Sequence, residues 1–502
     1  MGLTAGLIAP QLFSSCKKEN HGPIVKFNGS IAIIGAGASG LYAADILNAQ
    51  GLSVYVLEAR NSLGGRIRSF STSDTQTDNS NSAFIYDYTH PSIATFPLEL
   101  GGELIFGSDS AWGKIISVLN LPTADLATAE NQCILDNLVK AATAWQSDGD
   151  YNTVQNFVSG LSAYTGSDVS IAAAATAAGV SLRAQTLLNS QAGNYFGSSA
   201  DRISALALAT ELKSRTHNAK TLTAKTNAWQ DILLSRFNGI VNKVNLNTPV
   251  STIDYSGDTI VITDKGGKQY EANKVIVTVP LSILKSSGIV FTPELPSTNT
   301  AARNKFGMDA CVRMIIDFKK NFWGDADGFI WGGAIVPQYL NTGYGRGNNS
   351  RNPSEENYTL AMTVCGQAAE SMLASGMPPL IDQVLSELDQ LYPDPNHVYP
   401  GLGTKWVRRK IEYDSNNVPH ETDPIAIIYN WTNDPYVRGG YSYPLLGATP
   451  QDRIDLGTAV PGGKIFFAGE ATDILGDAGT VSGALQSAER AAQELIKSIT
   501  GP

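Results

Sequence analysis

The chain has 502 residues, of which 43% are hydrophobic and 16% charged, with a formal net charge of −10. Its length exceeds one ordinary domain, and its composition is that of a soluble globular protein with a large core. The acidic balance excludes nucleic acid as a partner, because that binding needs a concentrated basic face. Beyond the N-terminus no apolar run reaches the roughly 18 residues of a membrane span.

The N-terminal segment predicts export. Leu3 to Leu12 is a short apolar segment with small residues, and Phe13-Ser14-Ser15-Cys16 follows it. The pattern looks like the end of a bacterial signal peptide with a lipobox, in which Cys16 would be acylated. We therefore expect residues 1–23 to be a leader and linker of an exported, periplasmic or membrane-anchored lipoprotein. The alternative is a disordered leader on a cytoplasmic protein.

The block from Ile31 to Arg68 carries the strongest motif. An apolar run precedes Gly35-Ala36-Gly37-Ala38-Ser39-Gly40, and a helical period and a second apolar run lead to Glu58. Here Gly35 permits the tight turn, Gly37 the approach of a pyrophosphate, and Gly40 close packing of helix on strand. The helix N-terminus attracts phosphate, and an acid about 20 residues further on accepts ribose hydroxyls. The block predicts a dinucleotide site.

The rest of the chain alternates helical and strand patterns. Residues from Asp109 to Lys220 have a mostly helical pattern, and a last helix is expected over Val481 to Ile499. A doubly wound sheet that begins at Ile31 and recruits a strand near residue 465 implies two interleaved domains. The strands expected between these helical regions and near the end are Val244 to Ile253, Thr259 to Thr263, Lys274 to Pro280, Met314 to Phe318, Tyr358 to Val364 and Lys464 to Gly469.

The cysteines and histidines predict no metal site or base. Cys133, Cys311 and Cys365 are far apart in the sequence and odd in number, so we expect buried thiols and no disulfide framework. The histidines lie scattered in polar loops without catalytic or metal-ligand spacing; they are His21, His90, His217, His397 and His420.

Further segments carry a family resemblance. The motif at Glu58 continues through Leu63-Gly64-Gly65-Arg66, and the end of the chain has Phe467 to Thr472 and Gly479 to Ala484. With these, the chain resembles the flavin-containing amine oxidases from about Ile31 to Ala492. That group includes monoamine and polyamine oxidases, L-amino-acid oxidases and the lysine-specific histone demethylase. The segment from Trp431 to Tyr443 is similar to the polyamine oxidase and demethylase pattern.

The resemblance implies an α/β fold. A Rossmann-like, glutathione-reductase-like FAD-binding domain (24–108, 221–300 and 441–502) would interleave with a mixed-sheet and helical substrate domain (109–220 and 301–440). It also implies FAD, held noncovalently because Gly440 stands where monoamine oxidases have the flavin-linked cysteine. The cofactor-binding residues it implies are Gly35, Ala36, Gly37, Ser39, Gly40, Glu58, Arg60, Gly65, Arg66, Gly101, Gly102, Glu103, Val250, Trp431, Gly469, Glu470 and Val481. For Arg60, a surface position is the alternative.

The resemblance also implies a reaction. A hydride would pass from the carbon next to the nitrogen of a small-molecule amine to flavin N5, and the imine would hydrolyse to an aldehyde or ketone. The electrons would then reach oxygen, giving hydrogen peroxide, or another acceptor. Two alternatives are a flavin desaturase or dehydrogenase acting on C–C bonds and a nonenzymatic binding protein on the same scaffold.

Three positions bear on the substrate pocket. Tyr441 matches one wall of the family's aromatic cage, with an ordinary core aromatic as the alternative, and Thr480 replaces the second cage tyrosine. Glu103 either faces the pocket and favours a cationic amine, or bonds only backbone or FAD hydroxyls.

Arg313 stands at the family's lysine, which holds a water against flavin N5. Its alternatives are a register slip or a solvent-facing side chain. Because arginine stays protonated and is not interchangeable with lysine, the hypothesis that follows is slow reoxidation of the reduced enzyme in air. We name Tyr441, Arg313 and Thr480 as the catalytic candidates.

Overall fold

The computed structural model describes residues 25–70, 83–86, 98–324, 328–343, 358–395 and 401–501. The leader and Cys16 lie outside these ranges, as do His21, His90 and His397. Within the described ranges, no helix combines the length and hydropathy needed to cross a membrane.

One half of the molecule is built on a parallel five-stranded sheet in the order β11-β2-β1-β15-β26. Its central strand β1 (Ser30–Ile34) comes from the start of the chain and its edge strand β26 (Ile465–Phe467) from the end. The predicted class, an α/β fold with a Rossmann-like domain, is confirmed. The other three strands are β2 (Ser53–Leu57), β11 (Val244–Asn245) and β15 (Lys274–Val277).

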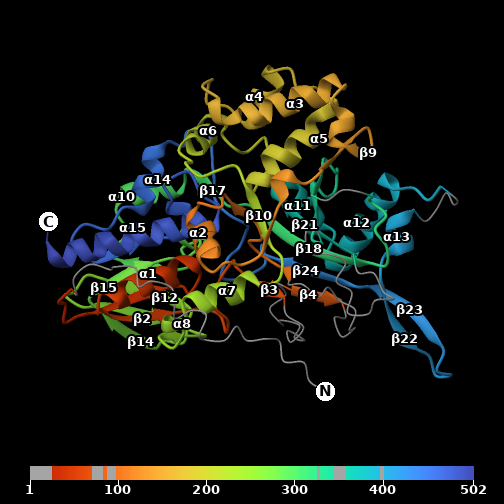
Figure 1. Cartoon of the computed structure of the whole chain (residues 1–502). Coiled ribbons are helices and arrows are strands. Elements are labelled where there is room, and N and C mark those ends of the chain that lie inside the picture. Colours follow the sequence, from red (N-terminus) through yellow and green to blue (C-terminus); the bar gives the residue numbers. More distant parts are fainter. Residues whose placement is uncertain are drawn as a thin grey trace.

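Both faces of this sheet are covered, which explains why its strands are continuous apolar runs. Alternate residues of β1 point to opposite faces. Ile31 and Ile33 pack under α1 (Ala38–Ala49) and α15 (Val481–Thr500), which lie side by side (Figure 1). Ala32 and Ile34 pack against a four-stranded sheet in the order β14-β13-β12-β16, formed by Gln269–Ala272, Ile260–Asp264, Val250–Asp254 and Val290–Thr292.

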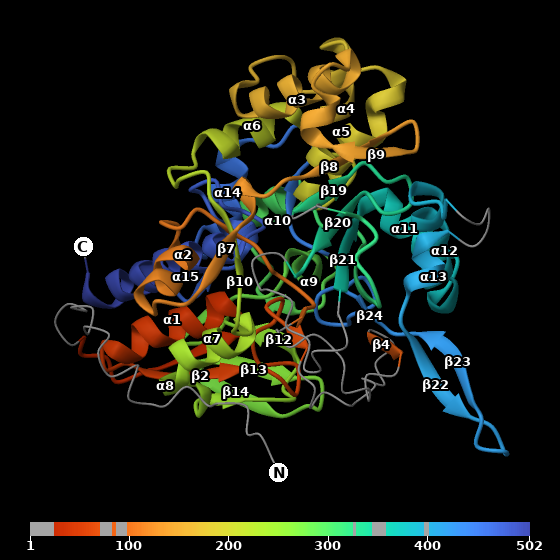
Figure 2. The ribbon, with the colours of Figure 1, turned by 45° about the vertical axis from the view of Figure 1, so that its right-hand side comes forward.

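The other half is built on an eight-stranded mixed sheet in the order β4-β24-β18-β21-β20-β19-β8-β9. Its two longest strands, β18 (Cys311–Phe318) and β21 (Tyr358–Cys365), pair antiparallel along their whole length. Helices α3 to α6 lie together at one end of the molecule, and the hairpin β22–β23 (Arg409–Tyr413, Pro419–Pro424) projects from the body (Figure 2). The remaining strands of the sheet are Ala83–Tyr86, Ala426–Asn430, Gln338–Asn341, Phe329–Trp331, Gln132–Leu135 and Leu138–Ala141.

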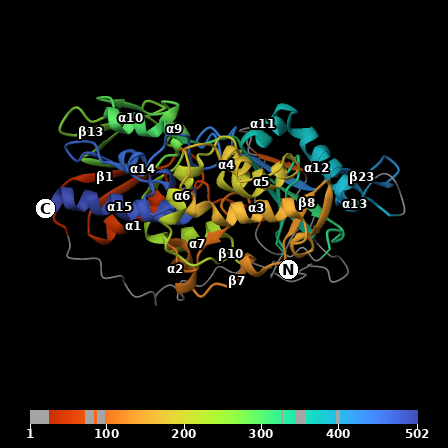
Figure 3. The same cartoon turned by 90° about the horizontal axis from the view of Figure 1, so that it is seen from above.

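Several of the other helices surround the two sheets when the molecule is seen from above (Figure 3). They are α2 Ala111–Val118, α3 Gly149–Gly160, α4 Ile171–Ala177, α5 Gln185–Leu188, α6 Ala205–Lys213, α7 Trp229–Arg236, α8 Asn238–Val241, α9 Leu281–Lys285, α10 Ser297–Arg303, α11 Gly366–Ala374, α12 Met377–Leu391, α13 Leu402–Trp406 and α14 Pro450–Gly457. The smaller sheets are the pair of β3 (Ser69–Phe70) and β5 (Leu98–Glu99), the pair of β17 (Phe306–Gly307) and β25 (Tyr443–Pro444), and a three-stranded sheet of β6 (Ile105–Phe106), β10 (Thr221–Ala224) and β7 (Thr123–Asp125).

Two sequence predictions of secondary structure were incomplete. The region from Asp109 to Lys220 also contains strands, and β8 and β9 form a hairpin closed by Asp136 and Asn137, both at positive φ. Such a two-residue turn is the usual signal of a tight hairpin. The strand expected over Val244 to Ile253 is two strands, because the chain turns through positive φ at Asn247.

Gly40 controls how closely α1 approaches the sheet. A Cβ atom there would lie 1.9 Å from the carbonyl oxygen of Gly35. We predict that Gly40→Ala destabilises the fold by about 1–3 kcal/mol through overpacking and lowers the FAD content of the purified protein. The measurements are the unfolding midpoint and the bound flavin per chain.

Gly239 in α8 provides the matched control, since a Cβ atom there meets nothing within 4 Å. Gly239→Ala should leave the midpoint unchanged or raise it slightly, because alanine is the better helix former. Equal midpoints for the two alanine variants would contradict this account of the turn.

Candidate active site

A cavity of about 540 Å³ begins at the carboxyl ends of β1 and β2 and extends to the eight-stranded sheet. That edge of a parallel sheet is where nucleotide ligands bind in such folds. Tyr441, Arg313 and Thr480 line it. So do fifteen of the cofactor candidates: Gly35, Gly37, Ser39, Glu58, Arg60, Gly65, Arg66, Gly101, Gly102, Glu103, Val250, Trp431, Gly469, Glu470 and Val481. The other two cofactor candidates, Ala36 and Gly40, belong to the glycine turn next to this cavity and do not line it.

Glu58 closes the turn at the nucleotide end of the cavity. Its side chain is buried and accepts hydrogen bonds from the backbone N–H groups of Ala36 at 2.6 Å and Arg60 at 2.9 Å. Burial raises the pKa of this carboxyl, although the two N–H groups oppose the shift. The carboxylate holds the glycine turn and the end of β2 together at the cavity edge.

Ser39 shows that this end of the cavity suits a phosphate. Its hydroxyl is buried in the first turn of α1 and has no hydrogen-bond partner among the described residues. A buried polar atom without a partner signals a missing ligand or water, and the free N–H groups of a helix start attract anions. The left-handed Gly35, with φ of 104°, makes the turn into this helix.

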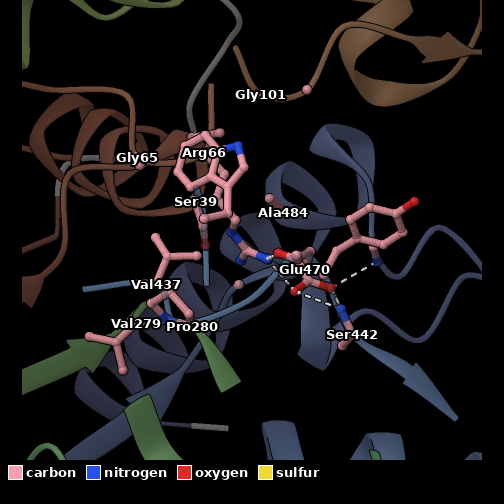
Figure 4. A pocket seen from close by; sticks show the side chains of 18 of the residues that line it. Ser39, Gly65, Arg66, Gly101, Val279, Pro280, Val437, Ser442, Glu470 and Ala484 are labelled. Carbon is pink, nitrogen blue, oxygen red and sulfur yellow. Dashed lines mark hydrogen bonds and ion pairs between the residues drawn. The ribbon is translucent and has the colours of Figure 1, made fainter. Parts of the chain in front are cut away.

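Glu470 joins several segments that line the other side of the cavity from Glu58. Its carboxylate is buried and binds Arg66 at 2.8 Å, the Ser442 hydroxyl at 2.7 Å and the Gly479 N–H at 2.8 Å (Figure 4). Burial alone would raise the pKa of Glu470, but Arg66, Ser442 and Arg453 together lower it. Glu470 therefore stays ionised and positions the chain around the cavity.

Arg60 is not a surface residue. Its guanidinium pairs with Asp434 at 2.5 Å and donates to the Tyr429 hydroxyl at 3.1 Å, and its side chain is 9% exposed. This contact excludes the surface alternative for Arg60 and ties the nucleotide end of the cavity to the segment that follows β24.

Glu103 and Arg313 form a buried ion pair at the cavity wall. Arg313 also donates from Nε to the Glu99 carbonyl at 3.0 Å and from Nη1 to the Thr363 hydroxyl at 2.6 Å. Arg313 therefore does not point to solvent, and Glu103 is not a free carboxylate. A buried pair of this kind is hard to break, because removing one partner leaves the other charge uncompensated.

Tyr441 lies against two glycines. Its ring carbons would meet a Cβ atom at Gly197 within 2.7 Å and one at Gly479 within 3.0 Å. Its hydroxyl donates to the Tyr195 carbonyl at 2.9 Å. Burial and the nearby thiols of Cys365 and Cys311 raise the pKa of Tyr441 well above its usual range, so it remains a phenol.

Trp431 is held in the same manner. Its indole Nε1 donates to the Leu100 carbonyl at 2.8 Å, and a Cβ atom at Gly101 would lie 3.2 Å from its ring. The loop of Gly101 and Gly102 can thus pass close over the indole. Both aromatic candidates in the matched segment are therefore fixed at the cavity.

The sequence analysis missed Tyr195 as a cavity residue. Its ring lines the cavity and makes edge contacts with Phe106 at 5.8 Å and Phe196 at 5.3 Å between ring centroids. The preceding residues, Asn189–Gly193, form a turn of π-helix, which often occurs at functional sites. A paired aromatic before glycine, Tyr195-Phe196-Gly197, was the only sequence signal.

Comparison with known proteins identifies the family. The family model for flavin containing amine oxidoreductases matches residues 241–496, just over half of the chain, and a model for NAD(P)-binding Rossmann-like domains matches residues 33–111. The chain belongs to the flavin-containing amine oxidoreductases. FAD is its cofactor, and it is an FAD-dependent amine oxidoreductase.

Its curated relatives are longer proteins. Human lysine-specific histone demethylase 2 is 25% identical over 463 residues, covering 89% of this chain and 51% of the relative. Histone demethylase-like protein A of Aspergillus fumigatus is 31% identical over 265 residues, 52% of this chain and 23% of the relative. The chain spans about half the length of the first of these and less of the second.

The solved structures support the fold. Wild-type putrescine oxidase bound to putrescine superposes with a TM-score of 0.69 at 20% identity, covering 93% of this chain and 99% of that one. Cyclohexylamine oxidase from Brevibacterium oxydans IH-35A has a TM-score of 0.68 at 18% identity, covering 95% and 99%.

The residues at the cavity fit FAD. Ser39 and the start of α1 would hold its pyrophosphate, and Glu58 its ribose. Val481 begins α15 and so offers a free N–H and the positive end of the helix dipole. Within the described residues, no cluster of three metal-ligating side chains is found.

We predict that Glu58→Gln weakens FAD binding about 10- to 100-fold. The amide cannot accept from the Ala36 N–H, the Arg60 N–H and a ribose hydroxyl as the carboxylate can, and a hydrogen bond to a charged group contributes about 1.5–3 kcal/mol. Titration of the apoprotein with FAD, followed by quenching of flavin fluorescence, measures the change.

Glu271 supplies the control for Glu58, because its side chain is exposed in β14, away from the cavity. Glu271→Gln should bind FAD as the unchanged chain does. Unaltered affinity in Glu58→Gln would contradict the role given to Glu58.

The Thr480 hydroxyl does not reach out to a substrate. It accepts from the Gly483 N–H at 3.1 Å and donates to the Asp477 carbonyl at 2.7 Å, and so caps α15. The structure thus gives the Thr480 hydroxyl a capping role, and its catalytic role stays a prediction. The sequence comparison located the position but could not show that the hydroxyl was already used.

We predict that Thr480→Ala destabilises the protein by about 1 kcal/mol, the usual effect of losing a helix cap. Thr480→Ser keeps a capping hydroxyl and should preserve the stability. Urea unfolding followed by circular dichroism measures both. If both variants keep full stability while flavin reduction slows in each, the capping role is wrong and a catalytic one returns.

Proposed function

We propose that this enzyme oxidises a small amine at the carbon next to nitrogen, giving an imine that water hydrolyses to an aldehyde or ketone. Bound FAD supplies the hydride acceptor. The observation that carries the proposal is one continuous cavity. Its lining includes Gly35 and Glu58 at the nucleotide end, and also the rings of Tyr441 and Tyr195. The matching family model, which extends through Tyr441, supports it.

The charges at the cavity wall favour a neutral amine. Glu103 is paired with Arg313, and Glu211 with Arg453 at 2.8 Å, so neither carboxylate is left to hold a cation. Arg313 is equally unavailable for a substrate carboxylate. A buried amine without a charged partner binds in its neutral form, because desolvation disfavours the ammonium. We propose a monoamine with an apolar body as the substrate class.

The aromatic side chains position this amine. Tyr441 and Tyr195 are joined by the hydrogen bond from the Tyr441 hydroxyl to the Tyr195 carbonyl, which fixes the ring. Since the Tyr441 phenol keeps its proton, it cannot act as a general base. Its contribution is orientation and exclusion of water, which align the carbon–hydrogen bond for transfer.

A panel of reductants tests the proposed function. The holoenzyme is mixed without oxygen with hexylamine, the diamine of equal length, an α-amino acid and a polyene, and the visible flavin absorbance is followed. We expect hexylamine to bleach the flavin faster than the diamine. Bleaching by the amino acid or the polyene alone, or by none of the four compounds, would contradict the proposal.

The Arg313–Glu103 pair supports a preference for an electron acceptor other than oxygen. We predict slow reoxidation of the reduced enzyme in air, and a rate about tenfold higher in Arg313→Lys, equal to about 1.4 kcal/mol of barrier. A lysine keeps the charge opposite Glu103 but is shorter and leaves room for a water. Stopped-flow mixing of the reduced protein with dissolved oxygen measures both rates.

Arg236 offers the control, because it pairs with Asp45 at 3.0 Å, away from the cavity lining. Arg236→Lys should reoxidise as the unchanged chain does. Rapid oxidation of the unchanged enzyme by oxygen, at ordinary oxidase rates, would remove the role assigned to Arg313.

A further inference from the structure

Cys311 and Cys365 face each other across two paired strands. They are direct partners in the antiparallel register of β18 and β21, and their sulfur atoms lie 3.4 Å apart. Both thiols are buried. The sequence predicted buried thiols, which is confirmed, and the fold adds that two of the three lie together. Cys133 is not part of the pair.

The local backbone suits a bond between them. The Cys311 N–H donates to the Thr432 hydroxyl and the Cys365 N–H to the Asn194 side chain, so this pair exchanges no backbone hydrogen bonds. In such a pair the opposed Cα atoms lie about 4.5 Å apart and the side chains are at their closest. That separation falls inside the range of about 4.4–6.8 Å found for disulfides.

The pair lies at the wall of the active-site cavity. Cys311 lines the cavity, and a Cβ atom at Gly440 would lie 3.3 Å from the Cys311 sulfur and 3.8 Å from the Cys365 sulfur. The next residue is Tyr441, and the thiols of Cys365 and Cys311 contribute to raising its pKa. The absence of a side chain at Gly440 therefore leaves space for two sulfurs directly behind the aromatic wall.

We propose that Cys311 and Cys365 are a redox-active dithiol that forms a reversible disulfide behind Tyr441. The sulfurs need to approach from 3.4 Å to about 2.05 Å, the length of a disulfide bond. Rotation of the two side chains achieves this without a change of strand register.

The chemistry balances with an ordinary oxidant. The two thiols lose two electrons and two protons as the sulfur–sulfur bond forms. Hydrogen peroxide takes them up as its oxygen–oxygen bond breaks, giving two waters. The peroxide comes from the surroundings of the enzyme, because the proposed preference for another electron acceptor means that the enzyme itself makes little of it. A small disulfide such as oxidised glutathione accepts the same electrons by thiol–disulfide exchange.

The two thiols differ in access. The neighbouring Cys311 thiol and burial raise the pKa of Cys365 well above its usual range, which makes Cys365 a poor nucleophile. Cys311 is the thiol that lines the cavity, and so it is where an oxidant in the cavity first reacts. The Cys365 sulfur then attacks the oxidised Cys311 sulfur while its proton passes to the leaving hydroxide or glutathione thiolate, which departs as water or glutathione and leaves the disulfide. Closure draws the two sulfurs together beside Gly440, and so changes the surroundings of the neighbouring Tyr441.

The test maps the bond in the intact holoenzyme. Samples are equilibrated without amine in glutathione buffers from fully reduced to fully oxidised, free thiols are alkylated under denaturing conditions, and the digested peptides are identified by mass spectrometry. We expect a linked peptide pair joining Cys311 to Cys365 in the oxidised samples, and its loss on reduction. Cys133, which is buried elsewhere, should be alkylated in all samples and is the internal control.

Two variants sharpen the assignment. Cys311→Ser and Cys365→Ser should each abolish the linked pair; the first leaves Cys365 alkylated, and the second leaves Cys311 alkylated or joined to glutathione. Alkylation of both cysteines in the unchanged, folded enzyme at the most oxidising poise would overturn the proposal, as would a glutathione adduct on Cys311 without the internal bond. Because no amine is present, a failure here is independent of a failure of the proposed function.

The functional consequence is measured separately. Oxidised and reduced holoenzyme are compared in the anaerobic reduction of flavin by the best amine of the panel. We expect the disulfide form to show a changed ratio of KM to kcat, and reduction with dithiothreitol to restore the original values. If the linked pair forms but KM and kcat are the same in the oxidised and the reduced holoenzyme, the disulfide does not act on Tyr441. That part of the proposal is then wrong.

Discussion

A single buried carboxylate holds together three distant parts of this chain. Glu470 binds Arg66 from the N-terminal block, Ser442 from the segment after the second sheet, and Gly479 ahead of the final helix. Arg453 extends the network by donating to the Ser442 hydroxyl at 2.9 Å. A cofactor that contacts both ends of the chain needs those ends to be held close together. The charge-assisted hydrogen bonds of Glu470 hold them there.

The second constraint on the cavity is that the two opposite charges at its wall neutralise each other. The Glu103–Arg313 pair places two charges at the wall and leaves neither free, and the surrounding lining includes the rings of Tyr441 and Tyr195. Such a wall accepts an apolar molecule with one neutral nitrogen more readily than an ion, because a buried ion without a partner is strongly disfavoured. In the proposed function, the choice of substrate and the acceptor of electrons both depend on the same ion pair.

Much of the nucleotide half could be predicted from the sequence, because its signals are local. The apolar runs of the parallel strands, the glycine turn and Glu58 lie within one stretch, and each has a physical reason for its residue type. Cavity residues such as Ser39 and Arg66 followed from the same block.

What could not be predicted depends on contacts between distant positions. Glu103 meets Arg313 across 210 residues, and Cys311 meets Cys365 through a strand register that no local pattern specifies. Thr480 matched a family position, but its hydroxyl is used by the cap of α15. Tyr195 lies in a helical region whose only hint was an aromatic pair before a glycine. Periodicity predicts which elements form and leaves the partners of their side chains to tertiary packing.

The proposed reaction moves a hydride from the carbon next to an amine nitrogen to the flavin bound in this cavity. The most direct measurement is the anaerobic rate of flavin reduction by one amine, compared with the same amine carrying deuterium at that carbon. The account predicts a several-fold slower reduction with the deuterated amine, since the carbon–hydrogen bond breaks in this step. Equal rates at saturating amine, with deuterium at another carbon slowing the reaction instead, would contradict it.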